Sequence, residues 1–426
     1  MKEIFKAGFY RLLFLGFNFL VGILIAAISG SAVFGTISLM IVNAALLHLI
    51  TGLGADQAIV WHGASQLFQK AKLFTFSFFL AFLQLFLFVL ISLFFFQITG
   101  KTLLSNNPSF QYFYWELIYF TGLVFLDKYV SLLYAQHNAR KCNLFLAIIT
   151  FIAVFILNVY RFNLVSAPVD PFRFLCLLTA GQALTVVLLF HIKERISFST
   201  FNKQDIFSFF RFSGLVFVTN IIQFLAYRAD YWFIDYFKNT DQVGIYSQAN
   251  RFAGLLWIVP NIIAALFIPS ISSPKNSLRE NELTVITRVL NYLNLLIVGL
   301  IIFTAFVIYT YFLRQDYFEG FLPLLYMLPG FYFFSITLLF AAYFSAKNIL
   351  WINLVGSSIC LIIIVIADLL LIPDFGIKGA AIANTIAYTL ATAFTMGMFL
   401  KISKLKPKDF FYLRKTDWRL ITKLQS

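Results

Sequence analysis

Long apolar segments recur along almost the whole chain, and only short polar connections separate them. A helix needs about 20 residues to cross roughly 30 Å of hydrocarbon, and nearly every segment reaches that length. The chain has 426 residues, of which 61% are hydrophobic and 12% are charged. A soluble protein of this size would have too little polar surface to cover itself. We therefore expect an all-α polytopic membrane protein with about twelve transmembrane helices: 9–29, 36–55, 73–99, 112–134, 142–162, 173–192, 206–237, 245–271, 290–312, 321–345, 349–372 and 378–400.

Lysine and arginine are distributed unevenly between the connections, and this bias predicts orientation. If the N-terminus lies in the cytoplasm, the cytoplasmic connections and termini hold 22 of these residues and the opposite connections hold 6. Both termini are therefore expected in the cytoplasm, with an even number of spans between them. The formal net charge is +14, but the one basic block long enough for a nucleic-acid-binding arm, the C-terminal tail, adjoins a membrane helix. We expect anionic membrane lipids as its partner, and no nucleic acid.

The polar connection 193–205 divides the spans into two sets of six. Many secondary transporters are built from two similar halves around a central path. We expect an N-terminal six-helix bundle over 1–195, a C-terminal six-helix bundle over 206–400 and a basic cytoplasmic tail over 401–426. The tail interleaves apolar with basic residues, so it is either an interfacial helix on anionic lipid or a solvated chain.

Charged residues inside the predicted spans are the candidates for function, because a charge at membrane depth costs several kcal/mol unless it is paired or hydrated. Arg228, Asp230 and Asp235 lie in the seventh span, and Arg251 lies about two turns into the eighth. Lys128 lies well inside the fourth span. Chains keep such charges mainly where they line a polar cavity. We infer that the seventh and eighth spans begin a second half that builds a transport path.

The same stretch carries motifs of a known family. The motifs are Arg228-x-Asp230, Gly244-Ile-Tyr246-Ser247-x-Ala249-x-Arg251, Pro269-Ser-x-Ser272 and, near the last span, Gly376-Ile-Lys-Gly379-Ala-Ala-Ile-Ala. They resemble the polysaccharide flippases (O-antigen-type, Wzx-like). That family belongs with the lipid II flippases and the multidrug and toxin extrusion (MATE) transporters in one exporter superfamily. The resemblance implies a fold of two six-helix bundles, similar to those of MATE transporters and lipid II flippases.

The resemblance also implies a function. A flippase of this family moves a polyprenyl-pyrophosphate-linked oligosaccharide from the cytoplasmic to the outer leaflet of the bacterial cytoplasmic membrane, by alternating access, for surface polysaccharide biosynthesis. Glycan-assembly membrane proteins are the expected protein partners, and we expect no enzymatic activity. One alternative is a cation-coupled multidrug exporter of the same fold. An alternative of another class is a polytopic glycan-assembly enzyme, against which the short connections speak.

Three basic residues are the predicted substrate-binding set: Arg251, Arg228 and Lys128. In the lipid II flippases a similar Ala-x-Arg pattern places an arginine in the central cavity, and Ala249-Asn-Arg251 resembles it. Arginine suits a pyrophosphate because its planar fork donates two parallel hydrogen bonds and stays charged. The structural alternative, for Arg251 and for Lys128 alike, is an ion pair with an acid on a neighbouring helix.

Asp230 and Asp235 are the predicted ion-coupling or orienting residues. Their alternative is a position at the end of a long seventh span that extends into water, where the charges are simply solvated. A cation-coupled exporter would need acids in the membrane, and Asp56, Glu116 and Asp368 are the other candidates. We expect each of these three near the membrane interface.

Several classes of site have no support in the sequence. The three cysteines make no CxxC pair and the four histidines are scattered, so we expect no metal site. The phosphate-binding motif GxxxxGK[ST] is absent, and Gly52-x-Gly54 lacks the third glycine of a dinucleotide site. We expect no catalytic residue and no cofactor. Prolines in or near the late spans predict helix kinks: Pro260, Pro269, Pro323 and Pro329.

Overall fold

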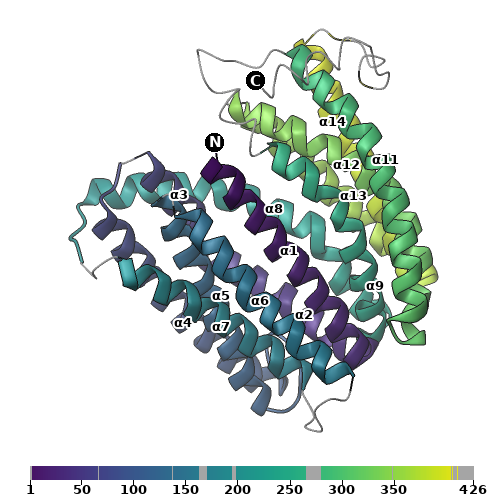
Figure 1. The fold of residues 1–426 in the computed structure, drawn as a ribbon, viewed down its shortest axis with the longest axis horizontal. Coiled ribbons are helices and arrows are strands. Elements are labelled where there is room, and N and C mark those ends of the chain that lie inside the picture. Colours follow the sequence, from purple (N-terminus) through teal and green to yellow (C-terminus); the bar gives the residue numbers. More distant parts are fainter. Residues whose placement is uncertain are drawn as a thin grey trace. The chain divides into compact units, whose positions relative to one another are not determined.

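The computed structural model describes residues 2–65, 67–136, 138–162, 170–193, 198–264, 280–347 and 349–403, together with 405 and 410. Over these residues the chain is helical and contains no strand (Figure 1). Eleven of the described helical segments are long and apolar enough to cross a membrane. The prediction of an all-α polytopic membrane protein is therefore confirmed.

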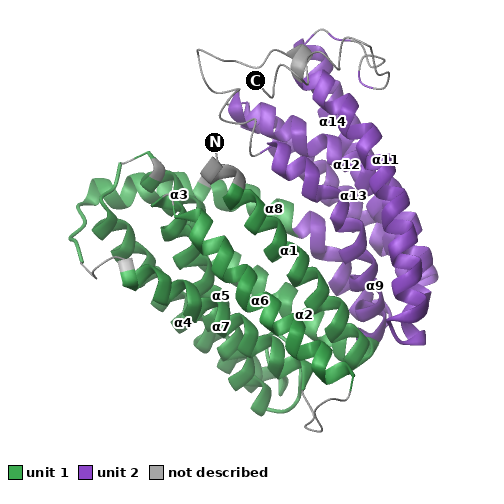
Figure 2. Ribbon diagram, in the orientation of Figure 1, with its two compact units in different colours: residues 1–224 green, residues 225–426 purple. Residues whose placement is uncertain are grey.

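The chain forms two compact units, residues 1–224 and 225–426 (Figure 2). In the first unit α1 packs mainly against α6, and α5 packs mainly against α7. The short helix α3, which the sequence did not predict, packs against α5 and α4. The helices that begin in this unit are α1 (Lys2–Ser29), α2 (Ser31–Gly52), α3 (Ala55–Ala64), α4 (Lys70–Thr99), α5 (Gln111–Ala135), α6 (Ala139–Arg161), α7 (Pro171–Lys193) and α8 (Lys203–Phe237).

In the second unit α14 packs against both α12 and α13. The fourth and sixth spans of each predicted half are thus partners: α5 with α7, and α12 with α14. The unit boundary falls inside α8, and the predicted bundle boundary at 195–206 stays a prediction. The later elements are α9 (Thr240–Ala253), the 3₁₀ turn η1 (Gly254–Trp257), α11 (Glu280–Tyr311), the 3₁₀ turn η2 (Gln315–Gly320), α12 (Phe321–Ala346), α13 (Leu350–Phe375) and α14 (Ile377–Ser403).

The eighth predicted span, 245–271, is not one continuous α-helix. Helix α9 ends at Ala253, and η1 follows before helix resumes over 258–264. Pro260 explains the break, because proline has no N–H to donate and its ring clashes with the carbonyl four residues earlier. Residues 265–271 lie outside the described part, as do the Pro269–Ser272 motif and nearly all of the tail.

Apolar side chains on the outside and polar ones on the inside mark the helices as membrane spans. On α4, Phe79, Phe82, Phe86 and Phe94 expose half or more of their surface along one face. Gln84 on the same helix is fully buried. This pattern is the reverse of a soluble helix, because lipid is the favourable contact for the phenyl rings and protein supplies the hydrogen bonds.

Candidate functional site

A buried polar network lies in the second unit, where α8, α9 and α14 meet. The Tyr246 hydroxyl on α9 donates to Asp230 Oδ2 on α8. Asn384 on α14 donates from Nδ2 to the same oxygen at 3.1 Å and to the Tyr246 hydroxyl at 2.5 Å. The backbone N–H of Tyr231 donates to Asp230 Oδ1 at 3.0 Å. Asp230 is therefore held inside the protein by three neutral donors, and the alternative that it is merely solvated is wrong.

Two arginines lie beside this network, both half-buried. Arg228 Nη1 donates to the Tyr231 hydroxyl at 3.0 Å, and its guanidinium lies 5.3 Å from the centre of that ring. Arg251 on α9 is close enough to Arg228 for the two positive charges to act on each other. The charge of Arg228 also interacts with Asp230. The structure therefore gathers the arginines predicted from α8 and α9 around Tyr231.

Two further acids belong to the second unit. Asp235 accepts a hydrogen bond from the Thr240 hydroxyl at 2.6 Å, which ties the end of α8 to the first turn of α9. Asp368 on α13 is fully buried, and neither of its carboxyl oxygens has a hydrogen-bond partner among the described residues. Its carboxyl group acts electrostatically on that of Asp230. An unsatisfied acid of this kind is costly to bury and is a candidate for binding a cation or a proton.

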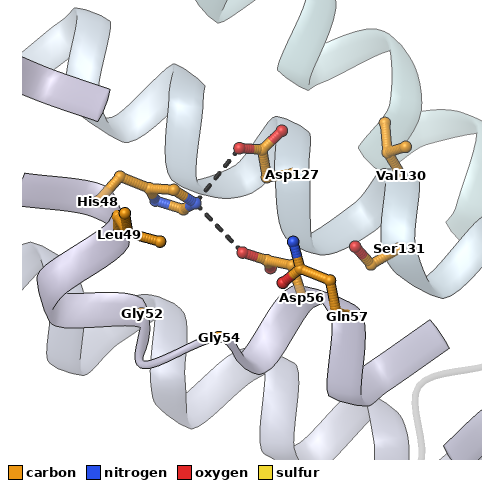
Figure 3. A pocket seen from close by; sticks show the side chains of 9 residues that line it. All are labelled: His48, Leu49, Gly52, Gly54, Asp56, Gln57, Asp127, Val130 and Ser131. Carbon is orange, nitrogen blue, oxygen red and sulfur yellow. Dashed lines mark hydrogen bonds and ion pairs between the residues drawn. The ribbon is translucent and has the colours of Figure 1, made fainter. Parts of the chain in front are cut away.

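A second cluster lies in the first unit, around a cavity of about 280 Å³ (Figure 3). His48 on α2 points between Asp56 on α3 and Asp127 on α5, with its Nε2 atom 3.2 Å from a carboxylate oxygen of each. Lys128, which is fully buried, donates from Nζ to the other oxygen of Asp56 at 2.7 Å. Lys128 therefore forms the inter-helix ion pair that was one of its two expected roles.

The charges of this cluster stabilise one another. Burial favours the neutral acid at Asp56, but the Lys128 ammonium and the His48 imidazole favour the carboxylate more strongly. Together they hold the pKa of Asp56 well below its usual range. Asp56 is thus ionised at neutral pH, and it serves as the anionic centre for both Lys128 and His48.

The turn between α2 and α3 brings Asp56 back toward His48. Leu53 and Gly54 have φ angles of 49° and 71°, so the chain turns from α2 into α3 within two residues. A Cβ atom on Gly54 would lie 2.5 Å from the Ser213 carbonyl oxygen of α8. A Cβ atom on Gly52 would lie 3.0 Å from Gln84 Nε2. Gly52 therefore leaves room for Gln84 and Lys128 in the cluster, and Gly54 leaves room for the backbone of α8.

Glu116 has a structural role in the first unit. It is fully buried and accepts hydrogen bonds from the backbone N–H groups of Leu104 and Ser105, at 3.1 and 2.8 Å. The Ser105 hydroxyl donates to it at 2.6 Å. Its hydrogen bonds organise the connection between α4 and α5, so we do not place it in either candidate site.

Sequence reasoning singled out most charged members of both clusters, but not Asp127, and it missed their neutral partners. It did not single out His48, Gln84, Tyr246 as a donor, or Asn384. Tyr246 lay within a family motif, which was the one available signal. His48 had none, because its partners are brought to it by the α2–α3 turn and by α5. Among the described residues, no three His, Cys, Asp or Glu side chains are arranged to hold a metal ion.

The sequence matches the model of one protein family over more than half of its length. A model of the family described as "Polysaccharide biosynthesis protein" matches residues 9–275. The comparison with curated proteins finds no match.

Solved structures share the fold across nearly the whole chain. The lipid II flippase MurJ, in an inward closed conformation, aligns with a TM-score of 0.71 at 14% identity, covering 99% of this chain and 95% of that chain. A multidrug resistance MATE family transporter, in an inward-facing conformation, aligns with a TM-score of 0.68 at 14% identity, covering 93% and 98%. The Vibrio cholerae MATE transporter VcmN, in its bent form, aligns with a TM-score of 0.61 at 13% identity, covering 96% and 98%. These likenesses confirm the predicted fold.

Proposed function

Because the chain belongs to the polysaccharide biosynthesis protein family, we propose that it moves a polyprenyl-pyrophosphate-linked oligosaccharide across a bacterial cytoplasmic membrane. The direction is from the cytoplasmic to the outer leaflet, by alternating access, with both termini in the cytoplasm. A hydrophilic glycan on an anionic pyrophosphate cannot cross hydrocarbon unaided. A hydrated path with cationic groups would hold the head group while the polyprenyl tail stays in lipid. The chemistry is transport, with no covalent step.

The observation that carries this proposal is that two arginines, Arg228 and Arg251, lie near each other. Repulsion from Arg228 raises the free energy of the charged Arg251 in the empty site, although Asp230 stabilises the charge of Arg228. A pyrophosphate would lower it, because each guanidinium donates parallel hydrogen bonds to phosphate oxygens. The neighbouring carboxylate of Asp230 is engaged by neutral donors, and Arg228 meets a neutral tyrosine hydroxyl. Lys128 would join the binding set only by exchanging Asp56 for phosphate.

The buried acids supply the proposed coupling. Asp230 lies beside the arginines and acts electrostatically on Asp368, so a cation or proton taken up there would change the field at Arg228 and Arg251. Asp235 orients α9, which carries Arg251, because it accepts a hydrogen bond from Thr240 at the start of that helix. The same acids keep the cation-coupled multidrug exporter as the second candidate. Anionic lipids and glycan-assembly membrane proteins are the proposed partners.

Reconstitution tests the proposal directly. Liposomes that contain the protein and a fluorescent polyprenyl-pyrophosphate oligosaccharide should show protein-dependent movement of the glycan between leaflets. Arg251→Ala should reduce the rate at least about 10-fold, since a charged hydrogen bond to phosphate contributes about 1.5–3 kcal/mol. Arg314→Ala removes an exposed arginine of the same unit and should leave the rate unchanged.

The outcomes separate the candidates. Movement that survives in Arg251→Ala would keep the function and discard the arginine site. An absence of movement, together with cation-driven efflux of a cationic dye from the same liposomes, would favour the multidrug exporter.

A further inference from the structure

The His48 cluster of the first unit has a charge imbalance. Asp56 and Asp127 each carry a negative charge, whereas Lys128 supplies one positive charge. With a neutral imidazole, the cluster has a net charge of about −1, and the two carboxylates that face the ring favour a proton on it. Protonation of His48 brings the sum to zero. Lys128 cannot balance Asp127 as well, because its ammonium already pairs with Asp56 at 2.7 Å.

Hydrogen bonds at the other ring nitrogen favour the opposite state. Gln84 Nε2 lies 3.2 Å from His48 Nδ1, 3.1 Å from the His48 carbonyl oxygen and 3.2 Å from the Thr51 hydroxyl. With the amide in this orientation its N–H can donate only to an unprotonated Nδ1, which corresponds to a neutral ring with its proton on Nε2. Gln84 is fully buried, and its Oε1 atom has no hydrogen-bond partner in the part of the chain that the structure describes.

Gln84 therefore offers a matching acceptor for a second ring proton. If the amide turns over, Oε1 faces Nδ1 and accepts from an imidazolium N–H, at the cost of the bonds to the His48 carbonyl and Thr51. The carboxylates favour the charged ring and the present amide orientation favours the neutral ring. The two preferences oppose each other, so the neutral ring and the charged ring each have hydrogen-bond partners here, which is the property that a histidine switch needs.

Solvent can reach the cluster. The Asp127 side chain is 42% exposed and the Asp56 side chain is 20% exposed, and both line the cavity beside His48 (Figure 3). The charged groups beside the ring are these two carboxylates and, on the other oxygen of Asp56, the Lys128 ammonium. Tyr119 on α5 lies near Asp127. Helix α4 faces His48 with the neutral Gln84, and the titratable residues of α1 lie within its first three turns.

We propose that His48, held between Asp56 and Asp127 and backed by Gln84, is a proton-binding site in the first unit. A proton from cavity water adds to Nδ1, no covalent bond to a heavy atom forms or breaks, and the cluster gains one positive charge. Uptake strengthens the link that His48 makes between α2, α3 and α5, and release weakens it. The claim that His48 binds a proton stands independently of the proposed function. The claim that this proton is coupled to transport rests on the proposed function. Asp230 and Asp368 belong to the second unit.

Histidine NMR on the full-length protein in lipid nanodiscs tests the site. The chain has only four histidines, so labelled imidazoles give few signals, and His48→Gln identifies the one that matters. We expect its ring to change from the Nε2–H tautomer to the imidazolium between about pH 9 and pH 5. Asp127→Asn removes the more exposed carboxylate and should lower the midpoint by about one pH unit or more. His191→Gln removes a ring that is hydrogen-bonded to Tyr129, and it should leave the His48 midpoint unchanged.

Three results would overturn the proposal. The first is a His48 ring that keeps a single form across this range, and the second is a ring that titrates alike with and without the Asp127 charge. The third is a ring whose charge follows sodium concentration at fixed pH, which would make the site a metal-cation site.

A transport measurement separates this proposal from the proposed function. In liposomes with an imposed pH gradient, wild-type movement of the glycan should respond to the gradient and His48→Gln should lose that response. Titration without any movement of the glycan would refute the flippase and leave the proton site. Movement of the glycan with a flat titration would refute the proton site alone.

Discussion

The Tyr246 hydroxyl links the buried network at Asp230, because it donates to the carboxylate and accepts from Asn384. Tyr246→Phe removes one donor from a buried charge and one acceptor from a buried amide. We expect a loss of about 1–3 kcal/mol in the free energy of unfolding. Thermal unfolding in detergent measures it, with Tyr236→Phe as the control, since that ring is 82% exposed. Equal melting temperatures for the two variants would contradict the role of the network.

At this scale the sequence identified charges but not their partners. Arg228, Asp230 and Arg251 were visible because a charge in an apolar run is rare and costly. Asn384 was invisible, because it is 154 residues from Asp230 and a single amide in a membrane helix is unremarkable by itself. Pairing is a long-range property, and hydropathy along one chain carries no information about it.

Gly54, directly before α3, lies against the backbone of α8. Its φ of 71° is left-handed, and a Cβ atom there would lie 2.5 Å from the Ser213 carbonyl oxygen and 3.0 Å from the Phe217 nitrogen. Gly54→Ala therefore adds a steric clash to backbone strain. Gly100 has a similar φ of 68° and nothing within 4 Å of the added atom, so Gly100→Ala reports the strain alone.

We expect Gly100→Ala to cost about 1–2 kcal/mol of stability. Gly54→Ala should cost at least about 1 kcal/mol more, because overpacking against backbone has no flexible neighbour to absorb it. Denaturation of the two variants side by side measures the difference. Equal losses would mean that α3 moves away from α8 without penalty.

Element ends were predictable from sequence to within a few residues for most spans, with the ninth predicted at 290 and found from Glu280. The apolar residues of a span are contiguous in sequence, and the thickness of the bilayer sets how long each apolar segment must be. Both properties can be read from the sequence. The short α3 was missed because ten residues cannot span a membrane. The break at η1 was missed because a proline signals a kink without fixing where the helix changes its hydrogen bonding.

Orientation of the whole molecule rests on charge bias, and labelling of single cysteines tests it. The native Cys142, Cys176 and Cys360 are buried, so they should not react with a membrane-impermeant maleimide. Two exposed positions lie on the predicted outer side, and two lie on the predicted cytoplasmic side. The four substitutions are Ser109→Cys and Gln315→Cys outside, and Thr200→Cys and Lys347→Cys inside.

The expected result in right-side-out vesicles is labelling at positions 109 and 315, with labelling at 200 and 347 only after permeabilisation. Three spans separate 109 from 200, so these two sites must lie on opposite sides. Three spans separate 200 from 315 only if the stretch 245–271 crosses the membrane despite its break at η1. If it does not cross, 315 will be protected together with 200, and 347 will label from outside. The position of 315 therefore decides whether the chain has the even number of spans that its lysines and arginines predict.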